Sequence, residues 1–185
     1  MATSSRKLTR SALLPPAATD FIRRRLIEGG GLLLALVGLA AVTALATFHP
    51  GDPSLNAAAG GEPRNWLGGG GAMFADVTMQ TIGAASWLLP VTVIAWAWRI
   101  VTRRGLGRLW LRFSLLPIAL VLTAIALAGL DVATDWALEA GYGGTVGDIV
   151  LAKTLPWSAG LTPLGADAVA LVAGALALAA ALAAP

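Results

Sequence analysis

Apolar and polar residues occur along this chain in long blocks. An uncharged apolar run covers residues 31–48, a second covers 73–98 with one carboxylate near its start, and a third covers 113–130. A fourth, Ala-rich run covers 166–185. A helix needs about 20 mainly apolar residues to cross the hydrocarbon of a bilayer, where only helices and closed barrels satisfy the backbone. The pattern therefore predicts an all-α integral membrane protein with four transmembrane helices.

Composition supports a membrane protein over a soluble domain. Hydrophobic residues make up 57% of the 185 positions and charged residues only 12%, and the mean hydropathy is +0.75. Soluble domains of this size carry about twice that share of charge. The chain contains no Cys and a single His, which excludes a disulfide framework and a thiolate metal site.

The basic residues predict the orientation of the spans. Of thirteen Lys and Arg, six precede the first span and five lie in the link 99–112, while the connections 49–72 and 131–165 hold one each. Cytoplasmic loops carry the excess of Lys and Arg, so the N-terminus and the loop 99–112 are predicted to be cytoplasmic, with outer loops over 49–72 and 131–165. Anionic lipid head groups are the expected partners of these cations. The arginines that carry this prediction nearest the spans are Arg23, Arg24, Arg25, Arg103, Arg104, Arg108 and Arg112.

The chain divides into a basic cytoplasmic segment, 1–28, and a four-span membrane domain, 29–185. The fourth span ends at Pro185 without the polar flank that closes the others, so we expect its helix to be truncated. A cleavable signal peptide is the alternative for the first span, because the residues at 44–46 fit a cleavage site. The basic region and the apolar run are both longer than a signal peptide requires, which favours a retained helix.

Few residues offer chemistry. Four glycines at 68–71 lack the following Lys of a phosphate-binding P-loop and are interpreted as a flexible lead into the second span. His49 at the end of the first span is interpreted as an interfacial polar residue. Asp76 is interpreted as a carboxylate of the first turn of the second span, although ionisable groups near a bilayer are often functional. We predict no catalytic, cofactor-binding or metal-binding residue.

One proline lies deep within a predicted span. Pro90 is expected to remove a helix hydrogen bond, free the Ser86 carbonyl and kink the second helix. Transport sites are typically built from broken helices and ionisable residues near the middle of the membrane. Pro90 is the sole deep interruption and no charged residue lies near the middle of a span. A self-contained four-span channel or transporter subunit therefore stays open as an alternative function.

Three blocks carry a resemblance to a known family. FHPGDPSLN at 48–56, the stretch 65–100 beginning NWLGGGG, and GGTVGDIV at 143–150 resemble, in order and placement, the N-terminal four-helix membrane region of FtsK/SpoIIIE-type DNA translocases. The positions that match the family pattern, and that are candidate partner contacts, are Phe48, Pro50, Asp52, Pro53, Ser54, Asn65, Gly68, Gly71, Asp76, Gly83, Pro90, Trp98, Arg99, Gly143, Gly144 and Gly147.

The resemblance implies a function that composition alone does not. It implies an anchor in the bacterial inner membrane at the division septum, belonging to a protein that couples chromosome segregation to division, with other division proteins contacting the outer loops. In the family a hexameric, ATP-driven motor moves DNA. This chain has no motif of that motor, so ATP, Mg²⁺ and DNA are expected only in a motor portion absent from it, and homo-oligomerisation is expected with that motor.

Overall fold

The computed structural model describes the chain over residues 16–55, 61–104, 107, 109–130, 132, 136, 138, 140–158 and 174. All regular secondary structure within these residues is helical. The elements are α1 (Pro16–Ala46), α2 (Gly68–Ile82), the 3₁₀ helix η1 (Gly83–Trp87), α3 (Leu88–Val101), α4 (Leu109–Ala128) and α5 (Gly144–Ser158).

Within the described residues, three helical segments are long and apolar enough to cross a membrane, namely Ala18–Ala46, Gly68–Val101 and Trp110–Ala128. The prediction of a helical membrane protein is confirmed to this extent. The predicted fourth span, 166–185, lies outside the described residues except for Gly174.

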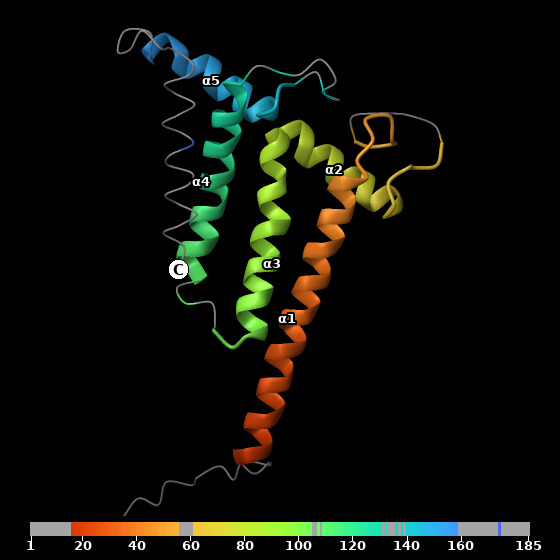
Figure 1. Ribbon diagram of the computed structural model, residues 1–185, viewed down its shortest axis with the longest axis vertical. Helices are drawn as coiled ribbons and strands as arrows, with labels where there is room; N and C mark the ends of the chain where they lie inside the picture. The colour runs from red at the N-terminus through yellow and green to blue at the C-terminus, as the bar shows by residue number, and fades with distance from the viewer. Residues whose placement is uncertain are drawn as a thin grey trace, which may run out of the picture.

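The helices form an upright group and a layer across one end (Figure 1). α1, α3 and α4 run along the long axis of the molecule, while α2 and α5 cross the end at which α1 stops and α3 begins. α1 packs along α3, α4 packs on α5, and α2 contacts both α1 and α5. We call the end with α2 and α5 the crossed end and the opposite end the Arg-rich end, because Arg99, Arg103 and Arg104 close α3 there.

Two glycines bring α1 close to α3. A Cβ atom on Gly38 would lie 2.6 Å from Cγ1 of Ile94, and one on Gly31 would lie 2.9 Å from Cγ2 of both Ile100 and Val101. Small residues drive such packing in membranes, because the apolar lipid tails provide no hydrophobic force between helices. Trp96 and Phe113 meet edge to face with ring centroids 5.3 Å apart and link α3 to α4.

The second predicted span is not one helix. α2 begins at Gly68, five residues before the predicted start, and the path breaks at η1 before α3. The expected kink at Pro90 is wrong in position. Pro90 lies in the first turn of α3, where a helix has no use for the missing N–H, and the break lies at Gly83, whose φ is +58°.

Two further elements differ from the sequence prediction. α1 begins at Pro16, inside the segment assigned to the basic N-terminal region, because an α-helix can extend past the hydrocarbon into the polar interface. α5 occupies part of the predicted outer loop 131–165. α4 also contains Pro117 within its length.

Candidate functional site: two junctions at the crossed end

The first junction joins the two ends of the connection between α1 and α2. The Asp52 carboxylate accepts hydrogen bonds from the backbone N–H of Arg64, at 2.8 Å, and of Asn65, at 2.9 Å. Its own backbone N–H donates to the His49 carbonyl at 3.0 Å. Asp52 is only 5% exposed, so its carboxylate serves the chain itself. The two side-chain bonds join residues 12 and 13 positions apart in the sequence.

Asn65 completes this junction. Its side-chain amide donates to the carbonyls of Ala44, at 2.7 Å, and Thr47, at 3.2 Å. Its side-chain oxygen accepts from the Leu67 N–H at 3.1 Å. The last carbonyls of a helix have no partner within the helix, so Asn65 caps the end of α1 while it orders the start of α2. Asp52, Asn65 and the groups that they bind are called the loop junction below.

The neighbours of the loop junction explain other motif positions. Phe48 packs on the cluster of Ala44, Leu45, Ala75 and Met79. A Cβ atom on Gly71 would overlap the side-chain oxygen of Asn65, which accounts for a glycine there. Pro50 is exposed, whereas Pro53 and Ser54 are half-buried.

His49 lies at the surface of the loop junction. Its Nδ1 accepts from the Gly51 N–H at 3.1 Å and its Nε2 lies 3.0 Å from Nη1 of Arg64. A neutral imidazole has only one acceptor nitrogen, so it accepts one of these two bonds at a time. His49 thus contributes a polar contact at the end of α1.

The second junction is made of backbone. Gly83 and Gly144 have φ of +58° and +62°, a sparsely populated backbone conformation that costs other L-residues about 1–3 kcal/mol. A Cβ atom on Gly83 would overlap the Tyr142 carbonyl oxygen, and one on Gly144 would overlap the Gly83 nitrogen. The Ala84 N–H donates to that Tyr142 carbonyl at 2.9 Å. The start of α5 therefore rests directly on the break after α2.

Two more glycines fit α5 against α4. A Cβ atom on Gly143 or Gly147 would overlap the Ala124 carbonyl oxygen, and both would crowd the Ala128 methyl group. Gly83, Gly143, Gly144 and Gly147 are called the glycine junction below. Thr145 adds a hydroxyl bond to the Gln80 carbonyl at 2.8 Å. The block GGTVG is thus a close-packing element that joins α5 to both α2 and α4.

Asp76 lies between the two junctions, in the middle of α2. It is 4% exposed, its Oδ1 accepts from Nε2 of Gln80 at 2.6 Å, and its buried Oδ2 has no hydrogen-bond partner among the described residues. The prediction that Asp76 occupies the first turn is wrong, because α2 begins at Gly68 and includes the glycines assigned to a flexible lead.

Comparison with known proteins bears on these junctions. A family described as the 4TM region of DNA translocase FtsK/SpoIIIE matches residues 23–184. The chain belongs to this family. The match spans both junctions and all sixteen motif positions, so the resemblance inferred from the three blocks is confirmed.

Individual FtsK/SpoIIIE relatives give the same result. The chain is 38% identical over 139 residues to the DNA translocase FtsK of Bradyrhizobium diazoefficiens, which covers 75% of this chain and 17% of that protein. It is 35% identical over 131 residues to that of Agrobacterium fabrum, covering 71% and 15%. It is 33% identical over 138 residues to that of Azospirillum brasilense, covering 74% and 22%. The chain thus spans less than a quarter of these relatives. No solved structure matches it.

Not all motif positions of this FtsK/SpoIIIE membrane region gather at the junctions. Pro90 is buried in α3, whereas Trp98, 64% exposed, and Arg99 lie in the last turn of α3 at the Arg-rich end. The motif residues from Phe48 to Gly71 surround the loop junction, and Gly83 with the later glycines forms the other.

The Arg-rich end contains a contact that sequence reasoning missed. Arg103 has a φ of +59° and donates to Oε1 of Glu28 from Nη2, at 2.6 Å, and from Nε, at 3.2 Å. Arg25 donates to Oε2 of the same carboxylate at 3.0 Å. Glu28 is the one acidic residue among the basic positions 23–28, a signal that could have identified it as their partner.

The other arginines of the topology prediction have separate environments. Arg112 is buried and donates from Nε to the Gly107 carbonyl at 3.2 Å. Arg23, Arg24 and Arg104 are exposed, and Arg108 lies outside the described residues. Within the described chain no three His, Cys, Asp or Glu residues lie together as a metal site.

Proposed function

We propose that this chain is the membrane-anchoring module of a cell-division DNA translocase, located at the division septum, where the whole protein couples chromosome segregation to division. The observation that carries the proposal is the family match over residues 23–184. The three candidate membrane spans support the anchoring part. The septal part rests on the membership in the family.

The proposed location is the bacterial inner membrane, with the N-terminus and the Arg-rich end in the cytoplasm and the crossed end outside. The charge asymmetry of the sequence supports this orientation. Arg25, Glu28 and Arg103 meet at the end assigned to the cytoplasm, and both junctions lie at the other end (Figure 1). Anionic lipid head groups are the proposed partners of the exposed arginines.

The crossed end offers a surface for other division proteins. Asp52 and Asn65 are buried, so we do not assign them direct partner contacts. Leu55 and Trp66, which flank the loop junction, are 73% and 80% exposed. An apolar pair held on an ordered connection suits protein contact, since aromatic side chains are enriched at interfaces.

Catalysis is assigned to the rest of such a translocase. The relatives carry the name DNA translocase, and the chain matches only a small part of each. ATP, Mg²⁺, DNA and hexamer formation are therefore proposed for a motor portion, with this module acting as the anchor.

A localisation experiment with matched variants tests the proposal. A fluorescent fusion of the chain is expected to concentrate at mid-cell in dividing bacteria. Asp52→Asn should reduce this enrichment, because it weakens the bonds that order the connection. Glu62→Gln, which removes an exposed carboxylate from the same connection, should leave it unchanged.

Other outcomes would contradict the proposal. An even distribution of the unaltered fusion around the envelope would remove the septal role. Selective solute flux through liposomes containing only this chain would instead favour the channel alternative. Topology reporters placed in the connections 56–60 and 105–108 test the orientation separately.

A further inference from the structure

α1 is longer than the membrane that it crosses. Its 31 residues extend for about 46 Å at 1.5 Å per residue, whereas the hydrocarbon of a bilayer is about 30 Å thick and takes about 20 residues. Counted back from Ala46 at the crossed end, the hydrocarbon boundary falls near Ile27. The turns of α1 before that residue therefore lie at the level of the lipid head groups.

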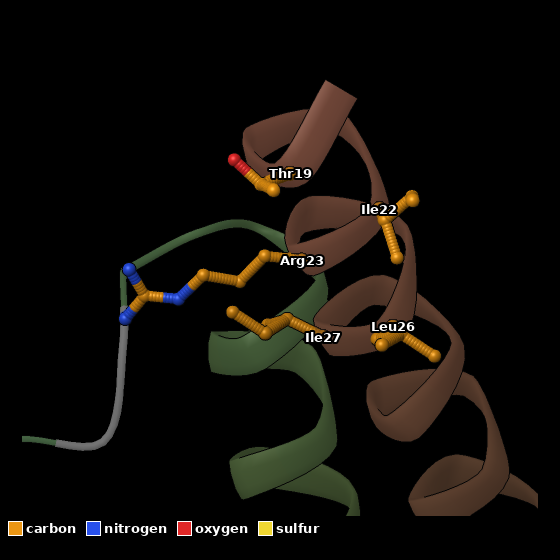
Figure 2. Close-up of a pocket in the computed structure, with 5 residues that line it drawn as sticks. All are labelled: Thr19, Ile22, Arg23, Leu26 and Ile27. Atoms are coloured by element: carbon orange, nitrogen blue, oxygen red, sulfur yellow. The ribbon is translucent and has the colours of Figure 1, made fainter. Parts of the chain in front are cut away.

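A pocket lies on α1 at this level (Figure 2). Thr19, Ile22, Arg23, Leu26 and Ile27 line it. Their spacing of three, four, seven and eight residues places them on one face of a helix. The apolar members are exposed, Leu26 by 71% and Ile22 and Ile27 by nearly half. Figure 2 shows the Arg23 side chain extending from this face, away from the axis of α1.

The three consecutive arginines of α1 are not equivalent. Arg25 stacks its guanidinium 5.3 Å from the centre of the Phe21 ring and donates to Glu28. Arg24 is exposed but does not line the pocket. Arg23 is thus the arginine that lines the pocket, together with the apolar residues Ile22, Leu26 and Ile27.

We propose that this pocket is a binding site for an anionic phospholipid of the surrounding bilayer. Arg23 binds the phosphate of the head group, and Leu26 and Ile27, which lie at the hydrocarbon boundary, contact the first carbons of an acyl chain. A phospholipid combines these two chemistries in the same order across the head-group boundary. This site assigns the lipid contact of the proposed function to particular residues. It rests on the proposed membrane insertion of the chain but not on its proposed septal location.

Native mass spectrometry of the whole chain, released from nanodiscs with equal amounts of phosphatidylglycerol and phosphatidylcholine, tests the site. The unaltered chain should retain phosphatidylglycerol preferentially. Arg23→Gln should lower that preference about fivefold, the change that corresponds to about 1 kcal/mol for a basic residue near an anionic surface. Arg24→Gln removes the same charge one residue away and should leave the preference near its original value.

A second variant tests the apolar part. Ile27→Ser should lower the retention of both lipids without changing their ratio, and circular dichroism checks that each variant keeps its helices. Equal effects of Arg23→Gln and Arg24→Gln would overturn the proposal in favour of diffuse attraction, as would equal retention of both lipids. Inorganic phosphate should not displace the lipid, and complete displacement would assign the site to a free anion. None of these readouts depends on where the protein lies in a cell.

Discussion

The two junctions of the crossed end both involve α2 and join it to other helices by opposite means: the loop junction to α1 and the glycine junction to α5. The loop junction uses buried polar side chains, Asp52 and Asn65, that saturate backbone groups from residues 44–67. The glycine junction depends on close backbone contacts, because Gly83 and Gly144 let two backbones touch. The first depends on donors and acceptors and the second on the absence of a Cβ atom, so each should fail under a different kind of substitution.

The largest effect is expected at the glycine junction. Gly83→Ala forces a Cβ atom against the Tyr142 carbonyl and strains a backbone at positive φ. Overpacking costs about 1–3 kcal/mol and the strain about 1–3 kcal/mol, so we expect a loss of roughly 3 kcal/mol in the free energy of unfolding, measured by denaturant titration in micelles.

The matched control for Gly83→Ala is Gly70→Ala. Gly70 lies in α2 with open space where its Cβ atom would stand, so this change should stabilise the protein by about 0.5–1 kcal/mol. Similar destabilisation by both substitutions would show that helix propensity, and not close approach, governs the region.

A smaller loss is expected from an isosteric change at the loop junction. Asn65→Asp keeps the shape but replaces the two N–H donors to Ala44 and Thr47 with an acceptor. Leaving a buried group without its partner costs about 1–3 kcal/mol, so thermal unfolding should report a loss of about 2 kcal/mol. Asn65→Asp with unchanged stability would remove the capping role assigned to the amide.

The combination of the two substitutions tests whether the junctions are independent. They lie at opposite ends of the 15-residue α2, which is about 22 Å long. Effects at sites that far apart add to within about 0.5 kcal/mol. The double variant Gly83→Ala, Asn65→Asp should therefore lose the sum of the single losses. A much smaller combined loss would mean that the two junctions break as one unit.

The smallest effect is expected at the Arg-rich end, where one residue depends on both backbone conformation and side-chain hydrogen bonds. Arg103 combines both devices, since it has a positive φ and donates two side-chain bonds. Arg103→Gly and Arg103→Ala remove the same bonds, but only the glycine relieves the backbone, by about 1 kcal/mol. The glycine variant should therefore unfold at higher denaturant concentration than the alanine variant, and the reverse order would show that the backbone there is relaxed.

Some properties could be predicted from local pattern. The length and hydrophobicity of the apolar runs predicted a helical membrane protein. About 20 apolar residues suffice to cross the bilayer, and a helix satisfies its backbone hydrogen bonds within itself. The order of three short blocks identified the family. The contacts within those blocks could not be predicted, since Asp52 and Asn65 bond groups 12 to 21 residues away.

The wrong predictions for Gly68–Gly71, Asp76 and Pro90 also arise from contacts between residues remote in sequence. Glycine disfavours helix, so Gly68–Gly71 were assigned to a flexible lead, yet all four lie in α2. Position 71 requires glycine because a Cβ atom there would overlap the Asn65 side chain. Asp76 was consequently placed at the wrong end of its helix. The break was predicted at Pro90 but lies at Gly83. The positive φ of Gly83 accompanies its close contact with Tyr142, which is remote in sequence.

Helical structure, membrane crossing and membership of the FtsK/SpoIIIE family could all be inferred from the sequence. Apolar length and motif order are properties of consecutive residues, and they need no information on tertiary contacts. Three features could be found only in the tertiary structure: the position of the break between α2 and α3, the carbonyls that Asn65 caps, and the packing of α5 on α2 and α4. Those outcomes depend on distances between backbones remote in sequence, where the presence or absence of one carbon or one N–H determines whether two helices can meet.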